Sequence, residues 1–301
     1  MKEIKGKIWF AAVVGILAIS CASLLIRWTQ APALTIAAYR VSIASGIFSL
    51  FAFKEFRKAD TANITKIHMF CIVAAGFALA AHFGFWITSL FWTSVASSVT
   101  IVNTAPVFVA ALSKRILREA VPPFFWFGVG LTIIGTVVLT GFDFQLSGKL
   151  AIGDLLALFG ALALAAYLII TRWILSAFPF FLYIFFAYGI AGLVLICLCV
   201  YLEIPTRGFS FDTYGLLFLI AIVPQCIGHS IFNWVLKFLP AFVVALLILG
   251  EPVGATILAA LFLNEVPNVR QLIALVMIGS GIVIGSSVNS PLRIDTMPES
   301  H

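Results

Sequence analysis

The sequence predicts an all-α membrane protein of ten transmembrane helices, arranged as two inverted five-helix repeats. Of its 301 residues, 62% are hydrophobic and 10% are charged, whereas soluble domains have roughly 45–50% and about 25%. So few charges cannot cover a surface that faces water. Apolar runs of about 20 residues, the length that spans a bilayer core, recur along the whole chain.

Ten apolar segments lie between charged or proline- and glycine-rich breaks. They predict helices at about residues 8–26, 34–53, 68–90, 94–113, 123–141, 152–171, 179–202, 213–235, 240–262 and 270–288. The first resembles a signal peptide, but it is long enough to span a membrane and lacks an A-x-A cleavage site, so we expect it to be retained. The polar tail, residues 289–301, is expected to be disordered.

Lys and Arg residues are distributed unevenly between the predicted loops. With the N-terminus in the cytoplasm, thirteen lie on the cytoplasmic side and four on the other, while Arg40 lies inside a helix. Because cytoplasmic loops carry an excess of Lys and Arg, both termini are predicted to be cytoplasmic. The net charge of +6 is thus explained by topology, and no basic face suited to nucleic acid is expected.

The two halves share an ordered set of matching residues. The pairs, separated by 145 to 147 residues, are Pro106 and Pro252, Glu119 and Glu265, Gly135 and Gly281, Arg27-Trp28 and Arg172-Trp173, and His82 and His229. They predict repeats at residues 1–146 and 147–288. Because five helices is an odd number, the second repeat must enter the membrane from the opposite face.

Glu251 and two matching prolines point to a site near the bilayer centre. Glu251 lies inside an apolar helix, where a carboxylate is costly and is usually kept for a function. Because loss of hydration favours the protonated form, Glu251 is a candidate for substrate binding and for proton coupling; a structural hydrogen bond is the alternative. Pro106 and Pro252 cannot donate a backbone hydrogen bond, so both helices should break there, with Asn103 beside the first break.

Further polar side chains lie within the predicted helices. We expect His82 in the outer third of the third helix and His229 in the inner third of the eighth, related across the midplane by the inverted repeat. Each either lines a cavity or serves as an interhelical hydrogen-bond donor. Trp86 and Asn233, about one turn away, are expected to be neighbours in the same site, as is Gln225.

Three more charged residues lie within or at the ends of the predicted helices. Arg40 lies about five residues from the outer edge of the second helix, so it either snorkels to the interface or turns inward to bind an anion or Glu251. Glu119 and Glu265, at membrane-edge turns, are expected to be capping or pairing groups rather than site residues.

Motifs of enzymes are absent from the sequence. It contains no HExxH, GxSxG, Walker A or GxGxxG pattern, and its five cysteines form no CxxC. We therefore expect no catalytic residue, no metal and no cofactor. Without an ATP site, any transport would be driven by a gradient or run downhill.

Three stretches resemble EamA-type transporters of the drug/metabolite transporter superfamily, over roughly residues 8–288. They are Ala38-Tyr39-Arg40, the stretch from Ser97-Ser98-Val99 through Pro106 to Leu117-Arg118-Glu119, and its counterpart from Leu249-Gly250-Glu251-Pro252 to Leu263-Asn264-Glu265. The resemblance implies a secondary transporter of the cytoplasmic membrane with a central cavity, often an exporter of amino acids or similar metabolites. The second half departs from symmetry at Gly189, where a counterpart of Arg40 is missing.

We therefore expect alternating access, with the halves rocking about a site near Pro106 and Pro252. An importer, a lipid-linked-sugar flippase and a channel are the alternatives, and a non-transporting scaffold or receptor should have a larger soluble region. The expected partners are a small-molecule substrate and the lipid bilayer, for a monomer or a homodimer, with no nucleic acid.

Overall fold

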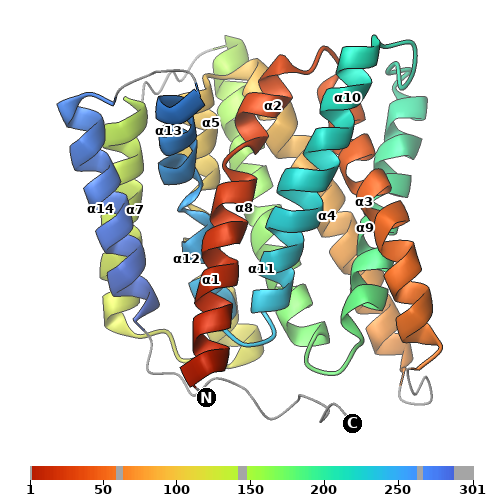
Figure 1. Ribbon diagram of the computed structural model, residues 1–301, viewed down its shortest axis with the longest axis horizontal. Helices are drawn as coiled ribbons and strands as arrows, with labels where there is room; N and C mark the ends of the chain where they lie inside the picture. The colour runs from red at the N-terminus through yellow and green to blue at the C-terminus, as the bar shows by residue number, and fades with distance from the viewer. Residues whose placement is uncertain (1, 59–63, 142–147, 263–266, 288–301) are drawn as a thin grey trace.

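The computed structural model describes residues 2–58, 64–141, 148–262 and 267–287, with no strand among them. Ten helical segments in these ranges are long and apolar enough to cross a membrane, which confirms the predicted fold class (Figure 1). Each segment agrees with its predicted range to within a few residues. The predicted tail, the boundary between the repeats and Glu265 lie outside the described residues.

Six of the ten spans are single helices, and four are interrupted. The single helices are α3 (Ala33–Phe56), α4 (Lys66–Trp92), α7 (Pro123–Thr140), α8 (Gly148–Ile174), α9 (Phe180–Tyr201) and α14 (Val269–Ser286). The interrupted spans are the first, with α1 (Lys2–Ile19) and α2 (Ala22–Trp28); the fourth, with α5 (Val95–Val102), α6 (Ala105–Leu112) and the π-helical η2 (Ser113–Leu117); the eighth, with α10 (Phe211–Ile220), the π-helical η3 (Ala221–His229) and α11 (Ser230–Val235); and the ninth, with α12 (Ala241–Ile248) and α13 (Glu251–Phe262).

The interruptions have local causes. Breaks in the fourth and ninth spans lie just before Pro106 and Pro252, where an amide hydrogen is missing. The change to π-helix in the eighth span surrounds Pro224, and such adjustments satisfy the carbonyls that a proline leaves free. The break in the first span lies at Ser20, whose hydroxyl donates to the carbonyls of Ile16 and Glu251. The last two breaks were not predicted.

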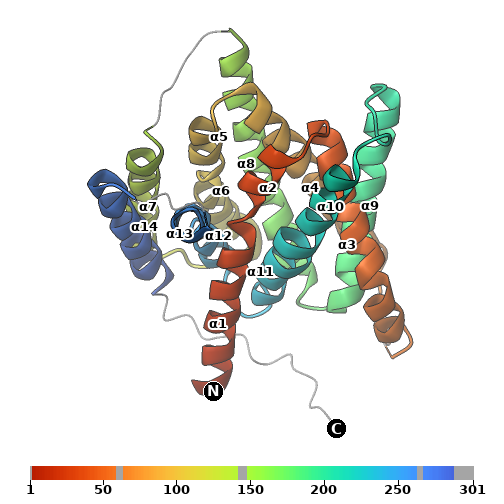
Figure 2. The same ribbon diagram turned by 45° about the horizontal axis from the view of Figure 1, so that its top comes forward.

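Helices pair as a two-fold axis in the membrane plane requires. α3 packs along α9, and α7 packs along α14, so the second span pairs with the seventh and the fifth with the tenth. α4 packs along α8, so the third span pairs with the sixth, and α1 packs on η3, so the first span pairs with the eighth. These two pairings are equivalent, because exchange of the two repeats turns one into the other. The fourth and ninth spans meet through α6 and α12, between the α7–α14 pair and the other helices (Figure 2).

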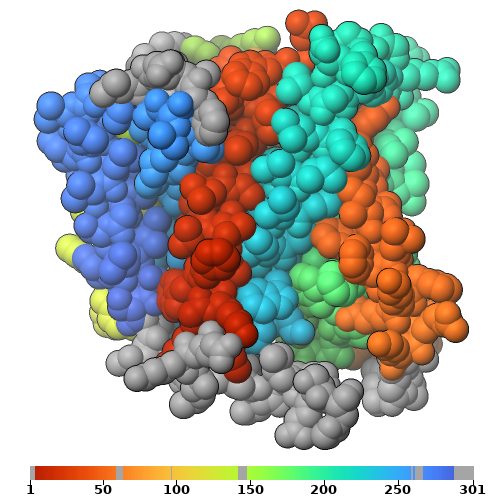
Figure 3. All heavy atoms as spheres, viewed as in Figure 1, coloured from red at the N-terminus to blue at the C-terminus, as the bar shows by residue number. Residues whose placement is uncertain are grey.

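The first span closes the front of the bundle. Figure 3 shows α1 between α13 on one side and α10 and α11 on the other. A methyl group at Gly250 would overlap the side chain of Ile16 in α1, and one at Gly254 would overlap that of Ser20 in the break after α1. The end of the bundle at which α1 begins is called the N-terminal face below, and the other end is called the opposite face.

Glycines bring α7 and α14 into backbone contact. A methyl group at Gly128 would lie 2.5 Å from the carbonyl oxygen of Gly281 and 2.6 Å from the Cα atom of Gly285. Glycines spaced four residues apart allow this close approach of membrane helices. The Gly281-x-x-x-Gly285 pattern therefore has a packing role.

The variant Gly128→Ala is expected to destabilise the protein by about 1–3 kcal/mol, because the added methyl group meets backbone that cannot turn aside. Gly130→Ala on the same helix is the matched control, since no atom lies within 4 Å of its methyl group. Melting temperatures of the two purified variants in detergent check the prediction. Equal melting temperatures would show that the two helices are not held by this contact.

Candidate functional site

A small cavity lies where the fourth and ninth spans, interrupted beside Pro106 and Pro252, meet. α6 begins at Ala105 and α13 begins at Glu251, and both residues line the cavity. Its volume is about 30 Å³, which is room for roughly two water molecules. In this conformation the cavity is therefore too small for a metabolite.

The cavity brings together five of the residues that the sequence singles out. They are His82, Trp86, Asn103, His229 and Glu251. The rest of the wall is apolar and comes from α5, α6, α8 and α12, and from the Leu249 turn between α12 and α13. The site thus combines a few polar groups with an apolar wall, as small-molecule sites commonly do.

Glu251 is positioned by the break in the ninth span. α12 ends at Ile248, the amide of Gly250 bonds back to the carbonyl of Leu247, and Glu251 opens α13. The partial positive charge at a helix N-terminus favours a carboxylate there. The Ser20 hydroxyl holds the Glu251 backbone from the first span, donating to its carbonyl oxygen at 3.0 Å. The side chain is left free to face the cavity.

Asn103 occupies the equivalent break in the fourth span. α5 ends at Val102, and the unwound turn is held by Thr104, whose hydroxyl donates to the carbonyl of Ile101 at 2.7 Å. The Asn103 side chain is 5% exposed. Its Nδ2 is buried without a hydrogen-bond partner among the described residues. Asn103 therefore presents an unused donor beside the cavity.

His82 and Trp86 form a stacked pair on α4. Their ring planes differ by 2°, and the ring centroids are 5.9 Å apart. The Nδ1 of His82 lies 2.9 Å from the carbonyl oxygen of Gly160. Because a carbonyl only accepts, Nδ1 carries the hydrogen, which leaves Nε2 as the acceptor in an uncharged ring. The Nε1 of Trp86 is buried and finds no acceptor in the part of the chain that the structure describes.

His229 lies next to His82, with 6.4 Å between ring centroids. The prediction that the two histidines occupy opposite thirds of the membrane is therefore wrong. Depth was inferred from residue counts at α-helical rise, but His229 ends the π-helical η3, whose wider turns advance less per residue. Both rings consequently share one layer beside the cavity.

Arg40 turns inward, and snorkelling is excluded because its side chain is 0% exposed. Its Nε donates to the Oε1 of Gln225 at 2.6 Å, and its guanidinium carbon lies 4.1 Å from the ring centroid of Phe83. Phe83 in turn meets the edge of His229, a cavity-lining residue. Arg40 is therefore one side chain behind the cavity wall, within electrostatic range of Glu251.

Asn233 does not reach the cavity. Its Nδ2 donates to the hydroxyl oxygens of Tyr167, at 2.7 Å, and Tyr188, at 3.0 Å. Tyr188 in turn bonds to Ser230 at 3.1 Å. This buried tyrosine network was not foreseen, although a tyrosine inside an apolar helix signals that its hydroxyl needs a partner.

Asp154 is a second polar centre that sequence reasoning missed. It is 6% exposed, and its Oδ1 accepts from the hydroxyls of Thr93, at 2.7 Å, and Ser97, at 2.6 Å. These contacts tie α8 to the turn between α4 and α5 at the opposite face. Asp154 lies in the sixth predicted span, so its position in an apolar segment was the available signal.

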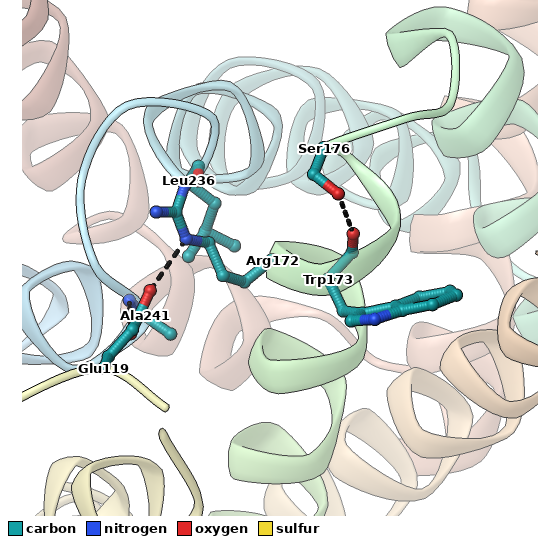
Figure 4. A network of polar contacts seen from close by, with 6 residues as sticks. All are labelled: Glu119, Arg172, Trp173, Ser176, Leu236 and Ala241. Atoms are coloured by element: carbon teal, nitrogen blue, oxygen red, sulfur yellow. Dashed lines mark hydrogen bonds and ion pairs between the residues drawn. The ribbon is translucent and has the colours of Figure 1, made fainter. Parts of the chain in front are cut away.

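Glu119 links three elements at the N-terminal face (Figure 4). Its Oε1 accepts from the Nε of Arg172 at 2.9 Å, and its Oε2 accepts from the amide of Ala241, the first residue of α12, at 3.1 Å. Arg172 also donates to the carbonyl of Leu236 at 2.5 Å. The predicted pairing and capping role of Glu119 is thus confirmed.

The cavity is closed more tightly toward the N-terminal face. On that side α6 packs on α12, and every residue of α12 is buried. On the other side, α5 and α13 share no comparable packing within the described ranges. The described conformation is therefore sealed between the cavity and the N-terminal face.

Comparison with known proteins agrees with this architecture. The sequence matches the EamA-like transporter family over residues 4–141 and 151–287, once in each half. No curated protein matches it. A solved structure titled "Crystal structure of protein" has a TM-score of 0.76 and 19% identity over 93% of this chain and 96% of that chain, which shows the fold alone. Because the two family matches together cover most of the chain, this protein belongs to the EamA-like transporter family.

Proposed function

We propose that this protein is a secondary transporter that exports amino acids or similar small metabolites across the cell membrane by alternating access, coupled to protons. Membership of the EamA-like transporter family makes it a membrane transporter of small molecules. One observation carries the rest of the proposal: a carboxylate, an amide, an indole and two imidazoles meet in one buried cavity at two matching helix breaks. Broken helices that end at the midplane are typical of transporter substrate sites.

The proposed movement follows from the exchanged pairing of the halves. The excess of Lys and Arg at the N-terminal face supports a cytoplasmic location for that face and for both termini. The described conformation is then closed to the cytoplasm. Rocking of the repeats would loosen the contact of α6 with α12 and bring α5 toward α13. This movement would open the cavity to the cytoplasm and close it toward the opposite face. The protein would act in this way as a monomer or a homodimer.

The proposed roles differ between the cavity wall and the layer behind it. Glu251 binds a proton or a cationic group of the substrate. The titratable groups that line the cavity with it are His82 and His229, and Arg40 and Cys21 lie within electrostatic range of it. Asn103 and Trp86 offer free donors to the substrate.

Behind the wall, Arg40 supplies positive charge, and Asn233 holds Tyr167 and Tyr188 in place. Asn233 is therefore proposed to act through the tyrosines rather than by contact with the substrate in this conformation.

A solute screen in proteoliposomes under an imposed proton gradient tests the proposal. We expect at least one amino acid or small metabolite to move at a rate that saturates with concentration. The variant Trp86→Phe, which keeps an aromatic ring but removes the N–H donor, should raise the KM for that solute by about 3- to 30-fold, as expected for loss of one hydrogen bond. A well-folded protein that moves no soluble compound but flips a lipid-linked sugar would overturn the proposal in favour of a flippase.

A further inference from the structure

The buried groups that lack a hydrogen-bond partner are almost all donors. Among the described residues they are Nη1 and Nη2 of Arg40, Nε1 of Trp86, Nδ2 of Asn103, Nε2 of Gln225 and the hydroxyl of Ser113. A buried donor without an acceptor is costly, and native structures contain few. Five of these six atoms, all but the hydroxyl of Ser113, belong to the cavity-lining residues Trp86 and Asn103 or to the Arg40–Gln225 pair behind the wall. Donors at the cavity and in the layer behind it are therefore left without acceptors in this conformation.

The orientation of Gln225 is fixed by Arg40. A guanidinium nitrogen can only donate, so the amide oxygen of Gln225 must be the atom that faces Arg40 Nε at 2.6 Å. The amide nitrogen is then directed away from Arg40 and is left without a partner. Gln225 lies beside Pro224 in η3, and π-helical turns of this kind are frequent at functional sites.

The guanidinium of Arg40 has used only one of its three nitrogens. Its charge is partly balanced by the face of Phe83 at 4.1 Å. Within the described ranges it forms no ion pair, because the Glu251 carboxylate, although within electrostatic range, lies beyond ion-pair distance. Arginine stays charged in proteins, so this buried cation is left with two unpaired NH2 groups and no directly bound anion.

We propose that the substrate carries a carboxylate and that Arg40 and Gln225 bind this group. The inference rests on the proposed transport function and adds to it the substrate group that is recognised and a residue, Gln225, that binds this group. A carboxylate accepts two parallel bonds from a guanidinium, and its charge is the one that Arg40 lacks. Trp86 and Asn103 supply donors for a second acceptor group on the same molecule.

Binding requires the cavity to widen toward Arg40. Phe83 and His229 lie between the guanidinium and the cavity, because Arg40 contacts Phe83 and Phe83 contacts the cavity-lining His229. We expect both side chains to rotate when the repeats move. Two kinds of carboxylate substrate would bring the summed charge of Arg40, Glu251 and the substrate to zero. An α-amino acid would place its ammonium group on ionised Glu251, whereas a 2-oxo acid would bind with Glu251 protonated.

Thermal unfolding of the purified protein tests the proposal with defined probes. They are an equimolar mixture of the twenty standard amino acids, the matching mixture of 2-oxo acids, and the amino acid methyl esters, which keep the amine but lack the carboxylate. We expect at least one of the first two mixtures to raise the melting temperature and the esters to leave it unchanged. Stabilisation by amino acids alone assigns the zwitterion, and stabilisation by both assigns the carboxylate itself. Stabilisation by the esters, or by none of the mixtures, overturns the proposal.

The variant Gln225→Glu supplies the missing anion from within the protein. We expect it to raise the melting temperature, because a carboxylate then faces Arg40, and to weaken stabilisation by the carboxylate probe at least about tenfold. Gln225→Met, of similar length and without charge, is the matched control and should not raise the melting temperature. If Gln225→Glu is more stable but responds to the probe as the wild type does, Arg40 is only structural and the proposal fails.

Failure of the proposal can be told apart from failure of the transport function. Saturable transport of a solute without a carboxylate would leave the transporter assignment in place and refute the carboxylate site. Absence of any transport, together with a carboxylate-dependent shift that Gln225→Glu removes, would support the site and refute the transport function.

Discussion

The variant Glu251→Gln is expected to lose proton-driven accumulation of substrate while keeping its fold. Glutamine matches glutamate in size but cannot exchange a proton, and Glu251 is the carboxylate that lines the cavity. If one proton is exchanged for each substrate, a gradient of one pH unit can sustain about tenfold accumulation. In proteoliposomes that carry the variant, accumulation under this gradient should fall to the level measured without it.

The controls for this experiment separate Glu251 from other titrating groups. Glu203→Gln removes an exposed carboxylate and should leave the response to the gradient unchanged. His82→Gln and His229→Gln test whether the imidazoles beside the cavity carry part of the pH response. Unchanged gradient dependence in Glu251→Gln, with normal expression and melting temperature, would refute proton coupling at this residue.

Breaking the pair between Glu119 and Arg172 is expected to open the N-terminal face. The two side chains are 15% and 12% exposed, and they join α8 to the first turn of α12, the half-helix that seals the cavity. Loss of one partner from a buried pair costs about 3–5 kcal/mol, and we expect somewhat less here because water reaches both groups. If conformations open at the N-terminal face lack this contact, as we propose, they should become more populated.

Labelling of a single cysteine measures this shift. In a background without the five native cysteines, Ala245→Cys reports access to the cavity wall beside α12. A membrane-impermeant thiol reagent applied at the N-terminal face should label it faster in Glu119→Gln and Arg172→Gln, with a non-additive effect in the double variant. Arg115→Gln, which alters an exposed charge at the same face, is the control. Equal labelling in all variants would show that the pair does not hold this face closed.

Local chemistry made some features of the site predictable. Pro106 and Pro252 each remove a backbone donor wherever the helix is placed, so the breaks beside Asn103 and Glu251 follow from sequence alone. A carboxylate in the middle of an apolar helix needs a polar environment in any fold. These signals sufficed to nominate Glu251 and Asn103.

Other features depend on which helices meet, and residue order does not reveal that. The partner of Arg40 is Gln225, 185 residues away, and the partner of Glu119 is Arg172, 53 residues away. Burial decided between the two interpretations of Arg40, and it follows from packing of α3 against η3. The depth of His229 was misjudged because a π-helical segment changes the rise along its span.

The site is asymmetric within a nearly symmetric scaffold. Ala105 and Glu251 open the equivalent half-helices α6 and α13, and both line the cavity, but only Glu251 carries a charge. Sequence comparison of the halves places Gly189, which packs against Ser45, at roughly the position of a counterpart to Arg40. We therefore expect the symmetry to allow the proposed movement of the two halves, and the residues without a counterpart to carry the proposed chemistry.

Substrate counterflow tests the central claim, alternating access through this cavity, most directly. Proteoliposomes are loaded with the unlabelled solute that the screen identifies and are diluted into a trace of the labelled solute without any ion gradient. A carrier that exposes its site to one side at a time should take up labelled solute transiently above its equilibrium level. Uptake that rises only to equilibrium, whatever the internal concentration, would show a channel and contradict the account.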